Sequence, residues 1–380
     1  MSEDTRLVTG IDRDFWAGRR VLLTGHTGFK GAWLSLWLQA LGARVVGLAP
    51  SGPATCPSLY ELARVGEGMA RERVADVRDG PALLRAVEEE RPEVVLHLAA
   101  QPLVRRSYRE PVHTYEVNVM GTVNVLEAVR RAGEGVCAVV VVTSDKCYEN
   151  PPEQVRRFVE GDPLGGEDPY SSSKACAELV TAAYRGSYFS SGGGPRVASA
   201  RAGNVIGGGD WGEDRLIPDI VRAVEGGQAV RVRNPRAVRP WQHVLNPLSG
   251  YLTLAQELWS TPEAAGAWNF GPAHEDARTV GWIVGRLAEH WGGALRWQAD
   301  GAAPDGVAGD GTGGDGAGGD PDLPEAGHLA LDSAKAERGL AWRPAWGLEE
   351  ALERVVSWHE AHRRGTDMRA VSLGQIADLA

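Results

Sequence analysis

A short apolar strand that runs directly into a glycine-rich loop and then into a helix is the feature that most constrains this chain. The loop TGHTGFKG covers residues 24–31, follows RRVLLTG, and continues into GAWLSLWLQALG, which has helical periodicity. Glycines in the spacing GxxGxxG let the backbone turn tightly and approach a pyrophosphate, whose charge is favoured at a helix N-terminus. The segment therefore predicts a dinucleotide site.

The same alternation of strand and helix continues through the first half of the chain. Further apolar runs occur in ARVVGLA, RERVADVRD, EVVLHLAA and VCAVVVVTS, and helical patterns separate them. This order is typical of a parallel sheet that is covered on both faces. We predict an α/β fold: a Rossmann-like doubly wound parallel sheet with a smaller, mixed α/β C-terminal lobe that binds the substrate.

The domain boundaries are predicted from where this regular pattern weakens. The dinucleotide-binding Rossmann domain is expected over residues 18–205, with residues 240–272 returning to it, and the substrate-binding lobe over residues 206–239 and 273–365. Residues 299–326 form an insert rich in Gly and Asp, which bury too little apolar surface to offset chain entropy, so we expect disorder there. The spacing of its aspartates fits neither the calcium nonapeptide nor the EF-hand loop, and we predict no metal.

Composition narrows the class of protein. A formal net charge of -10 argues against a nucleic-acid binder, because phosphate backbones attract basic surfaces. No apolar stretch is long enough to span a bilayer, and the acidic start MSEDTRL lacks an apolar signal core, so a cytoplasmic protein is expected. The four cysteines are widely spaced with no CxxC pair, which indicates structural thiols in a reducing compartment.

Lysine is rare enough in this chain to be informative. Of 40 cationic residues only four are Lys, namely Lys30, Lys146, Lys174 and Lys335. Arg cannot lose its proton near neutral pH, whereas the pKa of a Lys can be tuned by its surroundings. Chance explains the presence of any single Lys as well as a functional role does, but three of the four lie within motif-like stretches.

The residues expected to bind the cofactor follow the ends of successive strands. His26 and Lys30 could reach phosphate or ribose oxygens, whereas Phe29 favours packing. The second strand ends in GLAPSG, with neither an acid for ribose hydroxyls nor an Arg for a 2′-phosphate, so NAD and NADP are not distinguished there. Asp76 is a candidate for the adenine end or a solvated turn residue, and Ala99 and Ala100 either approach the cofactor or pack the strand. The full predicted set is Gly25, His26, Thr27, Gly28, Phe29, Lys30, Gly31, Asp76, Val77, Leu98, Ala99, Ala100, Tyr170 and Lys174.

A tyrosine and a lysine four residues apart in DPYSSSKACAELV provide the strongest catalytic signal. Tyr170 and Lys174 would share one face of a helix that Asp168 and Pro169 begin. An ammonium near a phenol can lower its pKa towards neutrality, which makes the phenolate a base for an alcohol proton.

The motifs TGHTGFKG, DVRD, HLAAQ, YSSSK and ARAGNVIGGGD, in this order over nearly the whole chain, resemble the extended short-chain dehydrogenase/reductase family. GHTGFKG, VTSDKCYEN, GNVIGGGDW and RPWQHV are more narrowly similar to its nucleotide-sugar 4,6-dehydratases, most of all those that act on CDP-glucose. The resemblance implies NAD held through the whole turnover, and a homodimer formed through helices near residues 113–131 and 170–185.

The resemblance also implies a role for each catalytic residue. Tyr170 would deprotonate the hexose C4 hydroxyl while hydride passes to NAD, Ser144 would hydrogen-bond that hydroxyl, and Lys174 would hold the ribose. Asp145 would protonate the C6 hydroxyl as it leaves, and the same hydride would return to C6. Lys146 stands where most relatives have Glu, and it either removes the C5 proton or stays charged and stabilises the enolate.

Substrate binding is expected after the sixth strand. Amide donors around Asn204 and the glycine triplet could meet a diphosphate, and the basic stretch RVRNPRAVRPWQHV is either a phosphate site or a solvated loop. Asn246 stands where the family has an acid, which weakens the substrate assignment but not the chemistry. The predicted substrate-binding set is Gln101, Asn204, Arg215, Leu216, Pro218, Arg239 and His243.

Two alternatives remain open. The chain could be a dehydratase or epimerase of another nucleotide sugar, a dTDP-, UDP- or GDP-hexose, although a simple C4 epimerase needs neither Asp145 nor Lys146. It could also be a non-catalytic dinucleotide-binding protein, although a sensor has no need of a tuned phenol at Tyr170.

Overall fold

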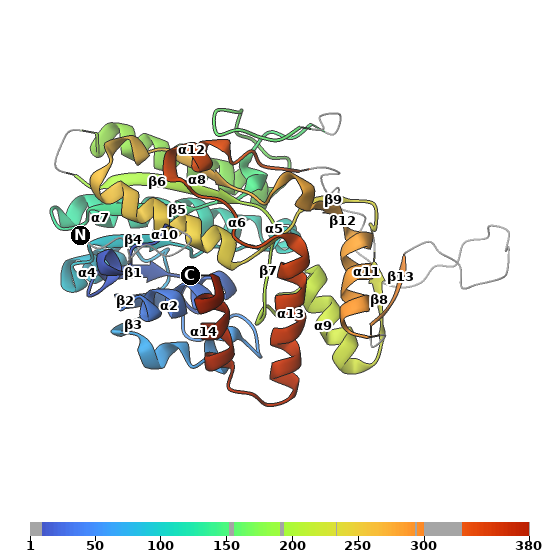
Figure 1. Cartoon of the computed structure of the whole chain (residues 1–380). Coiled ribbons are helices and arrows are strands. Elements are labelled where there is room, and N and C mark those ends of the chain that lie inside the picture. The colour runs from blue at the N-terminus through green and yellow to red at the C-terminus, as the bar shows by residue number, and fades with distance from the viewer. Residues whose placement is uncertain are drawn as a thin grey trace.

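A seven-stranded parallel sheet lies at the centre of the computed structural model, which describes residues 10–151, 156–190, 194–232, 234–292, 295–299 and 329–379 (Figure 1). Its strand order is β11-β6-β5-β4-β1-β2-β3, which confirms the predicted doubly wound α/β fold. The strands are β1 (Arg20–Thr24), β2 (Arg44–Ala49), β3 (Arg71–Val74), β4 (Val94–His97), β5 (Ala138–Val142), β6 (Arg196–Ala202) and β11 (Ala267–Phe270).

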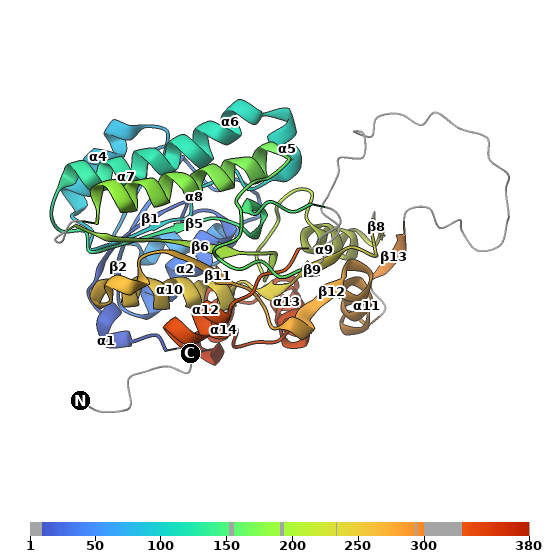
Figure 2. The ribbon, with the colours of Figure 1, turned by 90° about the horizontal axis from the view of Figure 1, so that it is seen from above.

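Helices cover both faces of this sheet (Figure 2). One face carries α4 (Gly80–Glu90), α7 (Gly121–Ala132) and α8 (Pro169–Tyr188), and the other carries α1 (Arg13–Trp16), α2 (Phe29–Ala40), α10 (Leu245–Ser260), α12 (Ala334–Leu340) and α14 (Met368–Leu379). All five residues of β5, AVVVV, are buried, because a central parallel strand packs apolar side chains on both faces. Separate apolar clusters lie on the two sides of the sheet.

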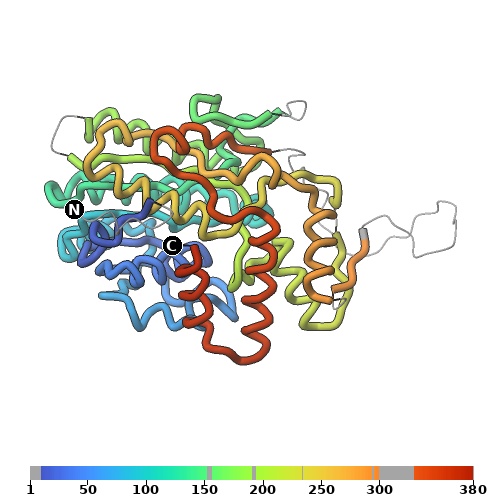
Figure 3. Tube along the Cα trace, in the orientation of Figure 1, coloured from blue at the N-terminus to red at the C-terminus, as the bar shows by residue number. Residues whose placement is uncertain are grey.

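A third apolar cluster builds the smaller lobe. Its elements are β8 (Ala229–Val232), β9 (Val238–Pro240), β12 (Ala277–Thr279), β13 (Arg296–Ala299), α9 (Leu216–Gly226), α11 (Val280–His290) and α13 (Leu348–Arg363). The trace leaves the sheet after β6, enters this lobe, returns through α10 and β11, and leaves again for α11 (Figure 3). Except for Ala299, the predicted Gly/Asp-rich insert lies outside the described residues.

Short elements connect the larger ones. They are β7 (Val205–Ile206), which pairs with β10 (Gln242–His243), and α3 (Leu59–Leu62), α5 (Val104–Arg109), α6 (Pro111–Tyr115), and the 3-10 turns η1 (Val65–Gly68), η3 (Asp145–Cys147), η4 (Pro262–Ala264) and η5 (His274–Asp276). The segment η2 (Glu116–Met120) is a π-helix between α6 and α7. Among the described residues, no helix is long and apolar enough to cross a membrane, and no cluster of His, Cys, Asp or Glu could hold a metal ion.

Candidate active site

The glycine loop forms a tight turn between β1 and α2. Gly25 has a φ of 76°, and a Cβ there would lie 2.8 Å from the Ala99 Cα, so only glycine allows this approach to the chain after β4. A Cβ at Gly31 would lie 2.0 Å from the Gly25 carbonyl oxygen. Gly28 is the N-cap of α2 and, within the described chain, no side chain caps it, so the first N–H groups of the helix remain for an anion. This turn fits the pyrophosphate of a dinucleotide.

Two polar side chains of the loop, His26 and Lys30, have partners elsewhere in the chain. His26 is buried, and its Nε2 lies 2.9 Å from the Glu72 Oε1 on β3, while Phe29 packs against the core. The Lys30 Nζ lies 3.5 Å from the Tyr251 Oη, within electrostatic range of Asp145 and Lys174. Burial, with smaller contributions from nearby cations, lowers the pKa of Lys30 to about 8. The contacts of both residues with phosphate or ribose oxygens stay predictions, and within the chain His26 binds Glu72 and Lys30 contacts Tyr251.

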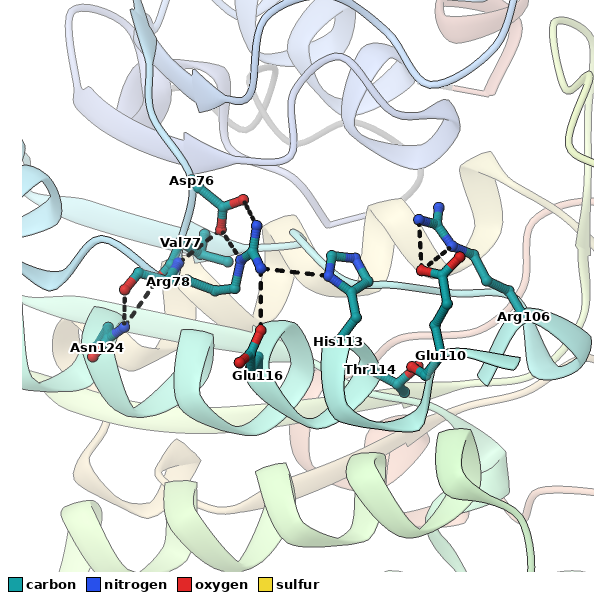
Figure 4. Close-up of polar contacts among 9 residues, drawn as sticks. All are labelled: Asp76, Val77, Arg78, Arg106, Glu110, His113, Thr114, Glu116 and Asn124. Atoms are coloured by element: carbon teal, nitrogen blue, oxygen red, sulfur yellow. Dashed lines mark hydrogen bonds and ion pairs between the residues drawn. The ribbon is translucent and has the colours of Figure 1, made fainter. Parts of the chain in front are cut away.

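Both oxygens of Asp76, the residue predicted for the adenine end, bind Arg78 (Figure 4). The Arg78 Nη2 lies 2.9 Å from the Asp76 Oδ2, and its Nη1 lies 3.1 Å from the Glu116 Oε2 on η2. The hydrogen bond from Arg78 holds the pKa of Asp76 below its usual range. Val77 is buried next to them. Any adenine contact by Asp76 is therefore shared with Arg78.

The polar segment TSDKCYEN begins where β5 ends. Ser144 is the N-cap of η3: its Oγ accepts from the Lys146 N–H at 3.2 Å and donates to the Asp145 Oδ1 at 3.0 Å. Asp145 is only 2% exposed, and its Oδ2 has no hydrogen-bond partner among the residues described. Burial raises the pKa of Asp145, although Lys146 and Ser144 oppose the shift. A buried carboxyl group with a raised pKa and a free oxygen can act as an acid.

Tyr170 and Lys174 lie one turn apart at the start of α8, which Asp168 caps by accepting from the Ser171 N–H at 2.9 Å. The Lys174 Nζ donates to the Val142 carbonyl at 3.3 Å, and burial lowers the pKa of Lys174 to about 8. Burial also raises the pKa of Tyr170 to about 12, despite an opposing hydrogen bond with Ser144. We expected the Lys174 ammonium to lower the pKa of Tyr170 towards neutral pH. In the chain by itself the pKa is raised instead, because burial disfavours the phenolate and outweighs the hydrogen bond from Ser144.

Two arginines of the substrate side reach the same centre. The Arg215 Nη1 lies 3.0 Å from the Asp210 Oδ2. The positive charge of Arg215 acts to lower the pKa of both Tyr170 and Lys30. The charge of Arg239 does the same to the pKa of Asp145. Leu216 and Pro218 open α9 directly after Arg215, and Asn204 is half-buried between β6 and β7. Of the predicted basic cluster, Arg231 and Arg236 are exposed and Arg233 lies outside the described residues.

Two predicted substrate residues, His243 and Gln101, have partners within the chain. His243 has no exposed surface, its ring packs against Trp33 and Trp346, and its Nδ1 accepts from the Leu245 N–H at 3.3 Å. Gln101 is buried, and its amide group binds the backbone of Leu103 and the Thr114 hydroxyl. The substrate contacts predicted for His243 and Gln101 stay predictions, and within the chain both side chains already have internal partners.

Two other residues singled out in the sequence are also structural. Asn246 is fully buried, and its amide binds the backbone of Ala345 and Trp346. Its departure from the family acid is therefore a matter of internal packing. Lys335 donates to the Ala267 carbonyl at 2.7 Å and lies 4.1 Å from the centre of the Trp268 ring, which separates it from the other three lysines.

The sequence did not predict Asn118, which the π-helix η2 directs inward. Its Nδ2 donates to the Ser173 Oγ at 2.9 Å and to the Gln101 carbonyl at 3.1 Å. These bonds tie η2 to the helix that carries Tyr170. π-Helical turns are frequent at functional sites, and no sequence pattern signals them.

A sequence model of the family described as GDP-mannose 4,6 dehydratase matches residues 22–355. The chain belongs to this family. It is 49% identical over 373 residues to a CDP-glucose 4,6-dehydratase of Salmonella typhimurium, covering 97% of this chain and 98% of that protein.

Solved structures of related proteins show the same fold. A dTDP-glucose 4,6-dehydratase from Streptomyces venezuelae, solved with NAD bound, superimposes with a TM-score of 0.72 at 26% identity, covering 92% of this chain and 99% of that one. A UDP-glucose 4-epimerase from Thermus thermophilus, in complex with NAD, gives a TM-score of 0.71 at 27% identity, covering 90% and 99% of the two chains. The family thus shares one fold with enzymes of related chemistry.

Proposed function

We propose that this chain converts CDP-D-glucose to CDP-4-dehydro-6-deoxy-D-glucose by an NAD-dependent intramolecular redox dehydration, as a hydro-lyase of deoxysugar biosynthesis. The observation that carries the proposal is Asp145, a buried acid with an unpartnered oxygen beside Ser144 and near Tyr170. A simple alcohol dehydrogenase or C4 epimerase uses a Tyr and a Lys but has no step for such an acid. The relative at 49% identity supports CDP-glucose as the substrate.

The residues around the glycine turn fit NAD. The uncapped start of α2 would bind the pyrophosphate, the close approach of Gly25 to Ala99 would let it lie on the backbone, and Lys174 would hold the ribose. Bound there, NAD would accept hydride from C4, return it to C6, and add the positive charge that a buried phenol needs to ionise. Asp76, Val77 and Arg78 would border the adenine.

The residues of this chain supply the proton transfers. Tyr170 takes the proton of the C4 hydroxyl, which Ser144 holds, and the resulting C4 ketone acidifies the C5–H bond. When the C5 proton leaves, its electron pair forms the enolate, and Asp145 protonates the C6 hydroxyl, which departs as water. When hydride returns to C6, the base gives a proton back to C5, which completes the 4-keto-6-deoxy product. Lys146 is our assignment at C5, and Lys30 is a second candidate because its lowered pKa leaves part of it neutral near pH 8. Arg215 and Arg239 would hold the diphosphate.

The oligomeric state, the domain boundaries and the location are proposed on separate grounds. Large exposed apolar side chains gather on neighbouring outer helices, with Val112, Tyr115 and Met120 on α6 and η2 and Leu179 on α8, which suits a homodimer. The third core supports a separate substrate lobe, although α12, which lies within the predicted range 273–365, packs with the central sheet. All four cysteines are free thiols, as expected in a reducing cytoplasm.

The test is a panel of nucleotide sugars. The purified protein is incubated with CDP-glucose, dTDP-glucose, UDP-glucose and GDP-mannose, with and without NAD, and the product is followed by mass and by ultraviolet absorbance in base. We expect loss of one water from CDP-glucose to give a 4-keto-6-deoxy product. Preferred turnover of dTDP-, UDP- or GDP-hexose would replace this assignment by the alternative of a dehydratase or epimerase for another nucleotide sugar.

A further inference from the structure

The turn that carries Ser144, Asp145 and Lys146 is held at both of its ends by one buried polar network. On its N-terminal side, the Thr143 Oγ1 donates to the Glu178 Oε1 at 2.5 Å. On its C-terminal side, the Tyr148 Oη accepts from the Arg201 Nη1 at 2.7 Å. Glu178 therefore binds Thr143, just before the turn, and Arg201 binds Tyr148, just after its last residue Cys147.

Glu178 and Arg201 bind each other at the centre of this network. The Arg201 Nη2 lies 2.7 Å from the Glu178 Oε2, and both side chains are at most 4% exposed. The Ser199 Oγ donates to the same Glu178 oxygen at 2.6 Å. A buried ion pair of this kind is costly unless both partners remain, because removal of one leaves an uncompensated charge.

The network continues to the edge of the sheet. The Tyr148 Oη donates to the Asn269 Oδ1 on β11 at 2.7 Å, and the Asn269 Nδ2 donates to the Phe158 carbonyl at 2.9 Å. Four elements therefore meet behind the catalytic turn, namely α8, β6, β11 and the segment after η3. Each hydrogen bond fixes one of them relative to the others.

Packing alone does not require charges at this place. A cluster of buried apolar side chains lies next to the network and includes Cys147, Phe158 and Leu331. Apolar residues of similar volume often stabilise a fold as well as a buried ion pair does, or better, whereas hydrogen bonds between charged groups fix direction and distance. The retained pair therefore indicates a requirement for geometry.

We propose that Glu178 and Arg201 are positioning residues that fix the catalytic turn relative to Tyr170 and Lys174 on α8. The inference rests on the proposed function and adds to it. Glu178 lies one helical turn after Lys174, so the residue that anchors Thr143 belongs to the same rigid helix as the catalytic pair. A shift of the network would move Ser144 and Asp145 away from the groups with which they act.

Glu178 also influences the charge of Lys174. Burial lowers the pKa of Lys174, and the carboxylate of Glu178 opposes that shift. The other titratable groups coupled electrostatically to this ammonium come from different elements: Lys30 on α2, His97 on β4 and Cys147 on η3. Removal of the carboxylate charge therefore lowers the pKa of Lys174 further.

The test compares Glu178→Gln and Thr143→Val with Thr181→Val. Thr181 is a matched control, because it is a buried threonine of the same helix whose hydroxyl binds only the Ala177 carbonyl among the residues described. A misplacement of about 1 Å costs roughly 10²-fold in rate, so we expect kcat to fall by about that factor in Glu178→Gln, with the KM for the nucleotide sugar little changed. We expect a smaller loss of kcat in Thr143→Val and an unchanged kcat in Thr181→Val.

The pH dependence separates positioning from a loss of stability. In Glu178→Gln, we expect kcat and NAD affinity to decline at a lower pH than in the wild-type protein, because the pKa of Lys174 falls when the carboxylate charge is removed. NAD affinity, followed by tryptophan fluorescence, needs no turnover, so it distinguishes this inference from a failure of the dehydratase assignment. Unchanged kcat and unchanged pH profiles in Glu178→Gln would overturn the proposal. If that variant does not fold, equal kcat values for Thr143→Val and Thr181→Val would overturn it instead.

Discussion

The two ends of the central sheet both carry charged residues, but they hold them differently. At the amino ends of the strands, Arg20 pairs with Glu93 and Arg71 with Glu90, and the side chains of these arginines are 44% and 61% exposed. At the carboxyl ends, the Arg201–Glu178 pair, Asp145 and Lys174 are all buried. Burial, rather than the presence of charge, distinguishes the end of the sheet that carries the proposed catalytic residues.

The consequence is a difference in what each charge can do. An exposed ion pair is worth about 0–1 kcal/mol, whereas breaking a buried pair by removing one partner costs about 3–5 kcal/mol. At the buried end, the pKa values of Asp145 and Lys174 also move away from their ordinary values. Substitutions at the two ends should therefore differ both in kind and in size.

The largest effect is expected at Tyr170. In Tyr170→Phe the base for the C4 hydroxyl is lost, so we expect kcat to fall by about 10²- to 10⁴-fold. Steady-state turnover of CDP-glucose measures this change, and NAD binding should persist as a control for folding. Retention of more than about a tenth of the activity would show that another group removes the proton.

A second large effect is expected at Asp145. Asp145→Asn keeps the shape but removes the acid, so loss of water should slow by roughly 10²-fold while the first hydride transfer continues. The near-ultraviolet absorbance of reduced nicotinamide, followed in a single turnover, should rise and persist. Normal release of water without this accumulation would contradict the role of Asp145.

The three site lysines can be compared with Lys335. Arg stays charged at all accessible pH values, so Lys146→Arg should lose about 10²-fold in activity if Lys146 is the base, while Lys335→Arg should lose almost none. Incorporation of solvent deuterium at C5 reports the step directly. Full activity in Lys146→Arg together with a large loss in Lys30→Arg would assign the C5 proton to Lys30.

The pH profile should decline on the alkaline side. Lys174 must carry its charge, and burial lowers its pKa to about 8, so the ammonium is present below that pH and is lost as the pH rises through it. Deprotonation of Lys174 should therefore lower the activity as the pH rises above about 8. The measurement is kcat against pH for the wild-type protein, and activity that keeps rising well above that pKa would exclude a requirement for charged Lys174.

The smallest effect is expected at the amino end of the sheet. Arg71→Gln breaks an exposed pair, so the free energy of unfolding should change by less than about 1 kcal/mol and kcat should stay the same. Arg201→Met at the buried end should lower both values. Chemical denaturation and turnover assays on the two variants would test the contrast, and equal losses would remove the distinction between the two ends.

The sheet and the catalytic segment could be predicted because their signals are local. Strands buried on both faces leave apolar runs such as AVVVV, and Ser144, Asp145, Tyr170 and Lys174 follow strand ends or begin a helix within short motifs. These positions converge because carboxyl ends of parallel strands share one edge of a sheet.

The partners of individual side chains could not be predicted, because they lie far away in the sequence. His26 binds Glu72, which is 46 residues distant, and His243 packs against Trp33 and Trp346. In the sequence, Glu178 looks like any charged residue of a surface helix, and only the packing of α8 on β6 makes it a buried partner of Arg201.

The intramolecular path of the hydride is the central claim, and a label at C4 tests it most directly. The protein is incubated with CDP-glucose that carries deuterium at C4, and the position of the label in the product is read by nuclear magnetic resonance. A dehydratase that keeps its NAD bound places the deuterium at C6 of a 4-keto-6-deoxy product. Deuterium that remains at C4, or that leaves with released reduced cofactor, would contradict the proposed reaction.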